Sequence, residues 1–304
     1  MVKLTHWSDE FDKDMERQGK SPITRRGYQA DLKDFSQWVE TTYGERFTVS
    51  NITRDDVRTY LAHVSTVRKA KPATVNRKLA ALSTFCRWAV SAGMLKDDPT
   101  ANIKGVKQVK TPPKALERAD LNRLVRKTQQ SGRPLHAAVV VLLANTGLRV
   151  GELCALTMGD VVIKPRSGKV IVRSGKGAKY REVPLNAETR QAVSQYLAVR
   201  LNPASPKQAD RLFIGQRGEA LAEGGVWRIV AKYARQAGIE DVSPHVLRHT
   251  FATLLLREHD TDLVTVADLL GHENVNTTAR YTRSTEADRQ AAVERLGRTP
   301  GGSQ

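Results

Sequence analysis

Residues 269–282 read LLGHENVNTTARYT, and this stretch decides how the end of the chain folds. Its two leucines are typical of the last turn of a buried helix. Gly271 is typical of a helix C-cap, because glycine adopts the left-handed backbone conformation without strain. His272 follows at once, and Tyr281 comes nine residues later in a polar, threonine-rich segment. Both side chains are either packed in a core or held for chemistry, and the rest of the chain distinguishes the two.

The charge of the chain favours a polyanionic partner. Its 304 residues, enough for two domains, include 49 Lys and Arg against 32 Asp and Glu, which gives a net charge of +17 and a pI near 10.1. Residues 1–110 hold 20 basic and 13 acidic side chains, and the remainder holds 29 and 19, so the excess is no detachable tail. Nucleic acid is the commonest large polyanion, although a charge that serves solubility alone is the alternative.

Cysteine usage and hydropathy indicate an intracellular protein. Cys86 and Cys154 both fall within apolar helical patterns, which predicts small buried side chains rather than a disulfide. The first residues, MVKLTHWSDEF, lack the apolar core of a signal peptide. The longest apolar run, 137–144, is far shorter than a membrane span. We expect a cytoplasmic protein with no membrane partner.

The first hundred residues predict four helices. Apolar side chains recur every three to four positions from residue 7 onward. Ser21 followed by Pro22 is typical of a helix start, Thr53 begins a capping-box pattern, and Pro72 opens the fourth helix. We therefore predict an N-terminal helical domain over residues 1–99.

The polar faces of these helices are biased to positive charge. A charge run is usually a solvated face, but the single sign favours a surface that contacts DNA phosphates. The predicted DNA-binding residues are Arg25, Arg26, Arg68, Lys69, Lys71, Arg77, Lys78 and Arg87 from the helices, with Lys107 and Lys110 from the segment that follows.

That segment, residues 100–115, lacks a periodic pattern and contains a Pro-Pro pair, which predicts an extended, basic interdomain linker. A second domain is predicted over 116–298, with a disordered tail over 299–304. Within this domain, helical patterns surround a period-two region at 161–185, which predicts three short antiparallel strands. The expected fold is therefore mainly α with a small antiparallel β-sheet.

Five basic side chains of the second domain stand apart from its apolar stripes. Each has an ordinary structural explanation by itself, such as a helix cap, a surface lysine or an arginine paired with a carboxylate. Together they share a charge sign and accompany one candidate nucleophile, a tyrosine. These candidate catalytic residues are Arg149, Lys176, His245, Arg248 and His272, with Tyr281 as the nucleophile.

This combination suits a phosphodiester. Two arginines can grip non-bridging oxygens through paired hydrogen bonds. Preorganised cations stabilise the extra negative charge of the transition state more than the ground state. A tyrosine with an ordinary pKa near 10 needs neighbouring cations and a base before it attacks. The leaving oxygen needs a proton, which a lysine on a hairpin could supply.

Other chemistries fit less well. His245 and His249 are four residues apart on one predicted helix, a possible zinc pair, but no third ligand cluster accompanies them. The chain has neither a GxxxxGK[ST] phosphate loop nor a GxSxG nucleophile elbow. We therefore expect no metal and no nucleotide cofactor.

At these residues the chain resembles the tyrosine recombinase (phage integrase) family, and in size and layout its Xer-type members. The matching segments are NTGLRVGEL, SGKGAKYREVPL, SPHVLRHTFAT, LLGH and ARYT, in the family's order across residues 145–282. Five motifs in order are specific, whereas any one alone would be weak. The N-terminal helices are similar to the family's core-binding, SAM-like domain by a weaker signature.

The resemblance implies a role for each basic residue of the set. Arg149 and Arg248 would bind the scissile phosphate, and Lys176 would be the general acid for the leaving oxygen. His245 would assist proton transfer at the tyrosine, and His272 would hydrogen-bond the phosphate in the transition state.

The resemblance also implies a C-shaped clamp around double-stranded DNA. Tyr281 would attack a phosphate to leave a 3′-phosphotyrosine and a free 5′-hydroxyl, with Glu152 orienting Arg149 or its neighbours. Family members work as tetramers of two dimers on synapsed sites, some with a second recombinase, and exchange strands through a Holliday junction. Neither a metal nor ATP is required, because the protein–DNA bond keeps the phosphoester energy.

Two alternatives stay open at this point. A type IB topoisomerase uses a tyrosine and cations in the same way but relaxes supercoils as a monomer. The basic N-terminal domain and a small apolar patch at Ala292, Val293 and Leu296 favour recombination instead. A DNA-binding protein that keeps the fold without cleavage is the other alternative, which the complete residue set opposes.

Overall fold

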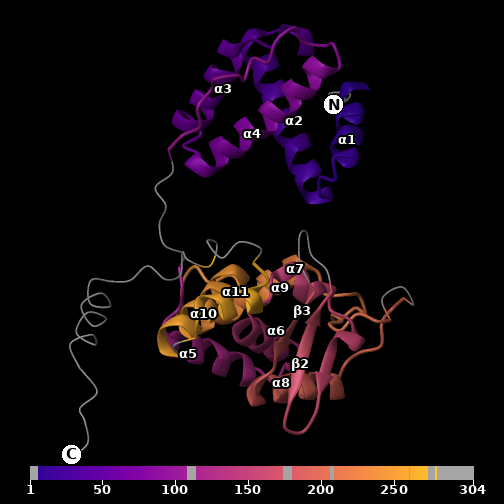
Figure 1. Cartoon of the computed structure of the whole chain (residues 1–304), viewed down its shortest axis with the longest axis vertical. Helices are drawn as coiled ribbons and strands as arrows, with labels where there is room; N and C mark the ends of the chain where they lie inside the picture. The colour runs from indigo at the N-terminus through magenta and orange to yellow at the C-terminus, as the bar shows by residue number, and fades with distance from the viewer. Residues whose placement is uncertain are drawn as a thin grey trace, which may run out of the picture. The chain divides into compact units, whose positions relative to one another are not determined.

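The computed structural model describes residues 6–107, 114–173, 180–205, 209–259, 261–272 and 278. The chain divides into two compact units, residues 1–110 and 111–304. Figure 1 shows a helical first unit and a second unit in which helices accompany a small sheet. The boundary between the units falls inside the segment for which a linker was predicted.

The first unit is built from the four helices that the sequence predicts. Ser21 accepts a hydrogen bond from the Thr24 backbone N–H at the start of the second helix, and Thr53 and Asp56 form a capping box at the third. The elements are α1 His6–Arg17, α2 Pro22–Tyr43, a 3-10 turn Val49–Asn51, α3 Arg54–Thr66 and α4 Pro72–Ser91.

Aromatic side chains dominate the core of this unit. Phe35 lies 5.1 Å from Tyr60 between ring centroids, in an edge-on arrangement. Phe85 contacts Trp7 at 5.1 Å and Phe11 at 5.3 Å. Such pairs bury large apolar areas and add about 1 kcal/mol each beyond that burial. Cys86 is buried in the same core as a free thiol, as predicted.

Lys78 differs from its prediction, because it is buried rather than on a polar face. Its side chain lies 2.7 Å from Asp34 and 3.1 Å from both Asp31 and the Tyr60 hydroxyl. Position 78 is three residues after Val75 and four before Leu82, so the helical period places it on the buried stripe. In this position the ammonium group serves the packing of α2, α3 and α4 and is withdrawn from solvent.

Part of the predicted linker packs on the first unit. The Asn76 side chain of α4 donates to the Val106 carbonyl at 2.9 Å and accepts from the Val106 N–H at 2.7 Å. Ile103 also contacts the core of this unit. These contacts place residues 103–106 of the predicted linker against the first unit.

The second unit contains the predicted antiparallel sheet. Its strands follow the order β1-β2-β3, with Val161 opposite Val170 and Val170 opposite Val183. The elements are α5 Arg118–Gln129, α6 Pro134–Thr146, α7 Val150–Ala155, a 3-10 turn Met158–Asp160, β1 Val161–Ile163, β2 Gly168–Val172, β3 Arg181–Pro184, α8 Ala187–Ala198, α9 Glu223–Gln236, α10 Pro244–Glu258 and α11 Leu263–Leu270.

Helix α6 is the centre of this unit. All its residues from 137 to 144 are buried, so this helix is apolar on every side. It packs against α5, α8 and α10. The class predicted from the sequence, mainly α with a small antiparallel β-sheet, is confirmed. Within the described ranges no helix has the length and apolar character needed to cross a membrane.

Candidate active site

The break after α6 places Arg149. Gly147 ends this helix with a φ of 61°, and a Cβ there would lie 2.5 Å from Phe251 of α10. Only glycine fits both the left-handed backbone and the close approach. The chain turns and starts α7, where the Arg149 N–H donates to Glu152 at 2.8 Å as a capping interaction. The Arg149 guanidinium also reaches Glu152, at 2.7 Å, and remains 41% exposed.

The end of α11 places His272. Gly271 has a φ of 64°, as predicted for a C-cap, and the His272 N–H donates to the Ala267 carbonyl at 3.0 Å. The His272 ring lies with Nε2 3.0 Å from Arg248 and Nδ1 2.7 Å from the Thr278 hydroxyl. A guanidinium can only donate, so Nε2 accepts and the proton of the neutral ring lies on Nδ1, where it is donated to Thr278.

Arg248 is a buried residue that joins two helix ends. Its side chain is 5% exposed. It donates to the Gly147 carbonyl at 2.6 Å and to the Leu270 carbonyl at 2.7 Å, besides its contact with His272. The guanidinium therefore lies where the end of α6 meets the end of α11.

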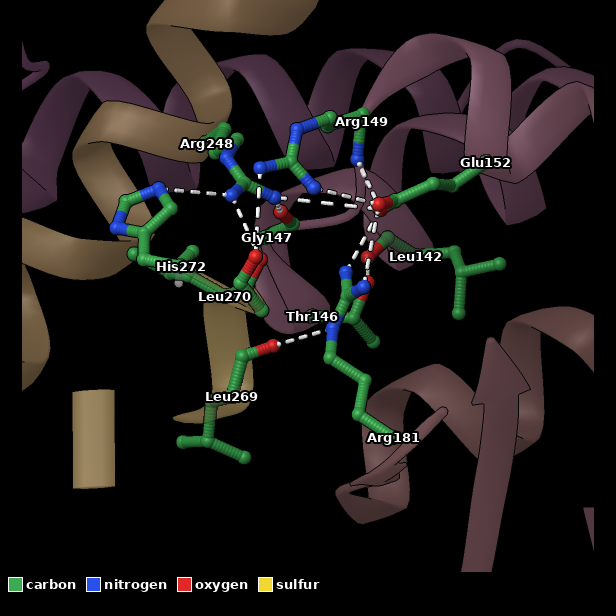
Figure 2. Close-up of polar contacts among 11 residues, drawn as sticks. Leu142, Thr146, Gly147, Arg149, Glu152, Arg181, Arg248, Leu269, Leu270 and His272 are labelled. Atoms are coloured by element: carbon green, nitrogen blue, oxygen red, sulfur yellow. Dashed lines mark hydrogen bonds and ion pairs between the residues drawn. The ribbon is translucent and has the colours of Figure 1, made fainter. Parts of the chain in front are cut away.

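The Glu152 carboxylate lies at the centre of the cluster, as Figure 2 shows. Arg149 and Arg181 donate to it, and an Arg248 nitrogen lies 4.0 Å away. Burial raises the pKa of Glu152, but the hydrogen bonds and charge of Arg181, with those of Arg149, outweigh it and hold the pKa below its ordinary value. Glu152 is thus an anion that three guanidinium groups share.

Arg181 and Thr278 are members of this cluster that the sequence reasoning missed. Arg181 donates to both oxygens of Glu152, at 3.1 and 2.7 Å, and to the Leu269 carbonyl at 2.9 Å. A signal for Arg181 existed, since it shares the buried face of β3 with Val183. No local pattern identifies Thr278 as the partner of the His272 ring, from which it lies six residues along the chain.

His245 differs from the residues of the cluster because its side chain is exposed. It is on the first turn of α10, three residues before Arg248, but it is exposed where Arg248 is buried. Its ring is 6.1 Å from that of Trp227 on α9, at an interplanar angle of 71°. Trp227 is itself 41% exposed, so both rings are accessible from solvent.

Lys176, Tyr281 and Lys110 lie outside the described residues. The strands on either side of Lys176 are described: β2 ends at Val172 and β3 begins at Arg181. The apolar patch predicted near the end of the chain also lies outside them.

The predicted DNA-binding residues of the first unit fall into two groups. Arg26, Lys69, Lys71, Arg87 and Lys107 are exposed. The others have acidic partners or are buried: Arg68 and Arg77 are also exposed but pair with Asp34 at 2.8 Å and with Asp31, Arg25 pairs with Asp12 and Glu16, and Lys78 is buried.

The cluster in the second unit is suited to binding a tetrahedral anion. Three arginines lie within 4.0 Å of one carboxylate, so formal charges leave two positive charges in excess. Partial burial reduces screening by water, which strengthens the attraction of these charges for an oxyanion. In the described ranges, no three His, Cys, Asp or Glu side chains gather as metal ligands do.

Comparison with known proteins shows the same family over both units. A sequence model of the phage integrase family matches residues 114–288, and one of the phage integrase N-terminal SAM-like domain matches residues 7–93. Tyrosine recombinase XerC of Roseiflexus castenholzii is 32% identical over 286 residues, which cover 92% of this chain and 86% of that protein. XerC of Neisseria meningitidis serogroup B is 34% identical over 284 residues, covering 92% and 91%.

A solved structure shares the fold. The XerH site-specific recombinase bound to its difH substrate, in a pre-cleavage complex, is 23% identical with a TM-score of 0.72 over 94% of this chain and 84% of that one. With the motifs around Arg149, Arg248 and His272 in one cluster and both sequence models matched, the chain belongs to the phage integrase family and is a relative of the Xer-type tyrosine recombinases.

Proposed function

We propose that this chain is a site-specific DNA recombinase that cleaves and rejoins strands through a covalent 3′-phosphotyrosine at Tyr281. The observation that carries the proposal is the cluster of Arg149, Arg248 and His272 around Glu152. Relatives over 90% of the chain that are named tyrosine recombinases support the same activity.

The two arginines and His272 bind the scissile phosphate. The Arg149 guanidinium is partly exposed, and its contacts with the buried Glu152 carboxylate fix its position. Arg248 donates to Nε2 of His272, so a phosphate that binds next to one side chain also lies next to the other. Arg149 is held before the substrate arrives and needs little reorganisation to stabilise the transition state, whereas Arg248 and His272 exchange part of their present hydrogen bonds for the phosphate.

The remaining chemistry belongs to Lys176, His245 and Tyr281. The Tyr281 oxygen attacks phosphorus, the bond to the 5′-oxygen breaks, and Lys176 gives that oxygen its proton. His245, on the exposed first turn of α10, moves the proton of the tyrosine. Rejoining is the reverse reaction, in which a 5′-hydroxyl attacks the phosphotyrosine, so neither a metal nor ATP is needed.

The DNA partner is a duplex recombination site held by both units. The exposed cations of the first unit, among them Lys69, Lys71 and Arg87, contact its phosphates. Strand exchange requires four protomers on two synapsed sites, with a Holliday junction as the intermediate. XerH was solved on its difH substrate, and this supports a DNA site as the substrate here.

The test is covalent capture of DNA. The protein is incubated in EDTA with a fragment library of its source DNA, and denatured, protein-attached strands are sequenced. The proposal predicts one short, roughly palindromic site with the natural protein and none with Tyr281→Phe. Recovery of scattered sites would favour a topoisomerase instead, and adducts that form in a parallel reaction with magnesium but not in EDTA would contradict metal independence.

A further inference from the structure

Arg181 is a buried arginine for which the sequence motifs assign no role. Its relative exposure is 8%, and it begins β3, the strand that follows the Lys176 segment. Both terminal nitrogens donate to the Glu152 carboxylate, at 3.1 and 2.7 Å, and its Nε donates to the Leu269 carbonyl at 2.9 Å (Figure 2). This paired geometry is the strongest that an arginine makes with a carboxylate.

These contacts join three elements of the site. Glu152 belongs to α7, next to Arg149, and Leu269 belongs to the last turn of α11, three residues before His272. Gly271 packs on the same guanidinium, since a Cβ there would lie 2.8 Å from an Arg181 nitrogen. One side chain therefore fixes the spacing between the group that orients Arg149 and the helix end that presents His272.

Charge gives Arg181 a second effect. Without it, Glu152 would direct its whole negative charge at Arg149, 2.7 Å away, and at Arg248, 4.0 Å away. The formal charge of the cluster would fall from +2 to +1, and the carboxylate would compete with a phosphate for the same guanidinium groups. With Arg181 paired to Glu152 at 2.7 Å, the other two arginines keep their excess positive charge.

We propose that Arg181 is a positioning residue that ties Glu152 to the end of α11 and balances the charge of Glu152, so that Arg149 and Arg248 keep their excess positive charge for the scissile phosphate. The inference rests on the proposed function and adds a residue to it. Arg181 acts through its neighbours and does not itself touch the phosphate.

The main test compares Arg181→Met with Arg200→Met by the rate of covalent adduct formation on a cleavage-site DNA. Arg200 is a matched control, because it is partly buried in the same unit and donates to backbone carbonyls such as that of Leu212 at 3.0 Å. Arg181→Met is expected to slow the reaction about 100-fold, as misplaced catalytic groups do. Arg200→Met is expected to react at the natural rate.

A double variant separates charge balance from simple loss of packing. Arg181→Met with Glu152→Gln restores the formal charge of +2 on Arg149 and Arg248. We expect this variant to react at least about tenfold faster than Arg181→Met alone. An equal or slower rate would contradict the charge balance, and a natural rate for Arg181→Met would overturn the inference entirely.

Two further measurements keep the inference testable if cleavage or folding fails. Hydrogen exchange of residues 263–272 needs no DNA and should be faster in Arg181→Met than in the natural protein or Arg200→Met, because Leu269 loses its donor. Unchanged exchange would contradict the tie, whereas absence of adduct from the natural protein would contradict only the proposed function. Should Arg181→Met not fold, Arg181→Lys keeps the charge and is expected to lose about tenfold in rate.

Discussion

Gly271 shows how one residue sets the geometry of the site. Its left-handed backbone ends α11 and turns the chain so that His272 meets Arg248 at 3.0 Å. The missing side chain also leaves room for Arg181, which a Cβ would approach to 2.8 Å. The sequence predicted the cap from the residue type, but the second reason for glycine depends on a residue distant in the chain.

Substitution of this glycine should therefore cost more than backbone strain alone. Gly271→Ala is expected to slow adduct formation about tenfold, because Arg181 must shift. Gly238→Ala is the matched control: its φ is 67° and nothing lies within 4 Å of the added Cβ. Both variants should lose about 1 kcal/mol of stability from strain in thermal melts, and equal adduct rates would contradict the argument.

The proposed role of Lys176 as proton donor leads to a prediction that does not depend on its position in the structure. Lys176→Ala should cleave ordinary DNA slowly, because the leaving 5′-oxygen then lacks its proton donor. On DNA with sulfur in place of that oxygen, the variant should approach the natural rate, since a thiolate leaves unprotonated. Gel-based rates on both substrates measure this. If the sulfur substrate is cut as slowly as the ordinary one, Lys176 is an electrostatic contact and not the acid.

At the scale of elements, the packing of α2, α3 and α4 depends on a polar network. Asp34 accepts from Lys78 at 2.7 Å, from Tyr60 at 2.6 Å and from Arg68 at 2.8 Å. Burial raises the pKa of Asp34, but these donors outweigh it and hold the pKa well below its ordinary value. The aspartate therefore stays ionised and gives the three helices one common partner.

Loss of the ammonium group would remove the buried donor that Asp31 and Asp34 share and leave them only the more exposed Arg77 and Arg68 as cationic partners. Lys78→Met is expected to destabilise the first unit by about 3 kcal/mol, measured by urea unfolding. Lys33→Met, an exposed change on α2, should stay within about 0.5 kcal/mol. A small effect of Lys78→Met would mean that its aspartate partners are solvated once the lysine is gone.

The sequence predicted helices and strands better than contacts between distant side chains, because helices and strands depend on local patterns. Helix starts such as Ser21-Pro22 and the alternation in β3 are local, so nearby residues specify them. The burial of Lys78 is also local, because the helical period from Val75 to Leu82 places it on the buried stripe, whereas the positive sign of its neighbours favours an exposed face. The pair between Arg181 and Glu152 spans 29 positions and depends on how β3 and α7 pack, which no periodicity encodes.

At the scale of the whole molecule, a half-buried histidine outside the site makes stability depend on pH. His136 on α6 bonds the Tyr233 hydroxyl at 2.8 Å. Burial, with the positive charges of Arg133 and Lys232, lowers the pKa of His136 from 6.5 to about 4. Between these values the unfolded chain takes up a proton that the folded chain does not, so stability falls as pH falls.

This loss should disappear when the imidazole is replaced. The calorimetric transition of the second unit is expected to decrease between pH 6.5 and 4 in the natural protein. His136 contributes at most about 1.4 kcal/mol per pH unit to that slope. His136→Gln should show a flatter dependence over the same range. Identical slopes for the two proteins would mean that His136 takes up its proton while folded.

The identity of the nucleophile is the central claim for the molecule as a whole, and Tyr180 provides a close comparison. Tyr180 is 60% exposed at the edge of the Lys176 segment, and its hydroxyl donates to Glu182 at 2.6 Å. That hydrogen bond raises the pKa of Tyr180, which disfavours its phenolate. Tyr180→Phe is therefore expected to form adducts at the natural rate.

The most direct measurement maps the attached nucleotide by mass spectrometry. The protein–DNA adduct is digested with nuclease and trypsin, which cuts after Arg280 and Arg283 and releases Tyr281-Thr-Arg. We predict that this peptide carries the 3′-phosphonucleotide and that Tyr281→Phe yields none. A nucleotide found on Tyr180 or any other residue would contradict the assignment of Tyr281 and the mechanism built on it.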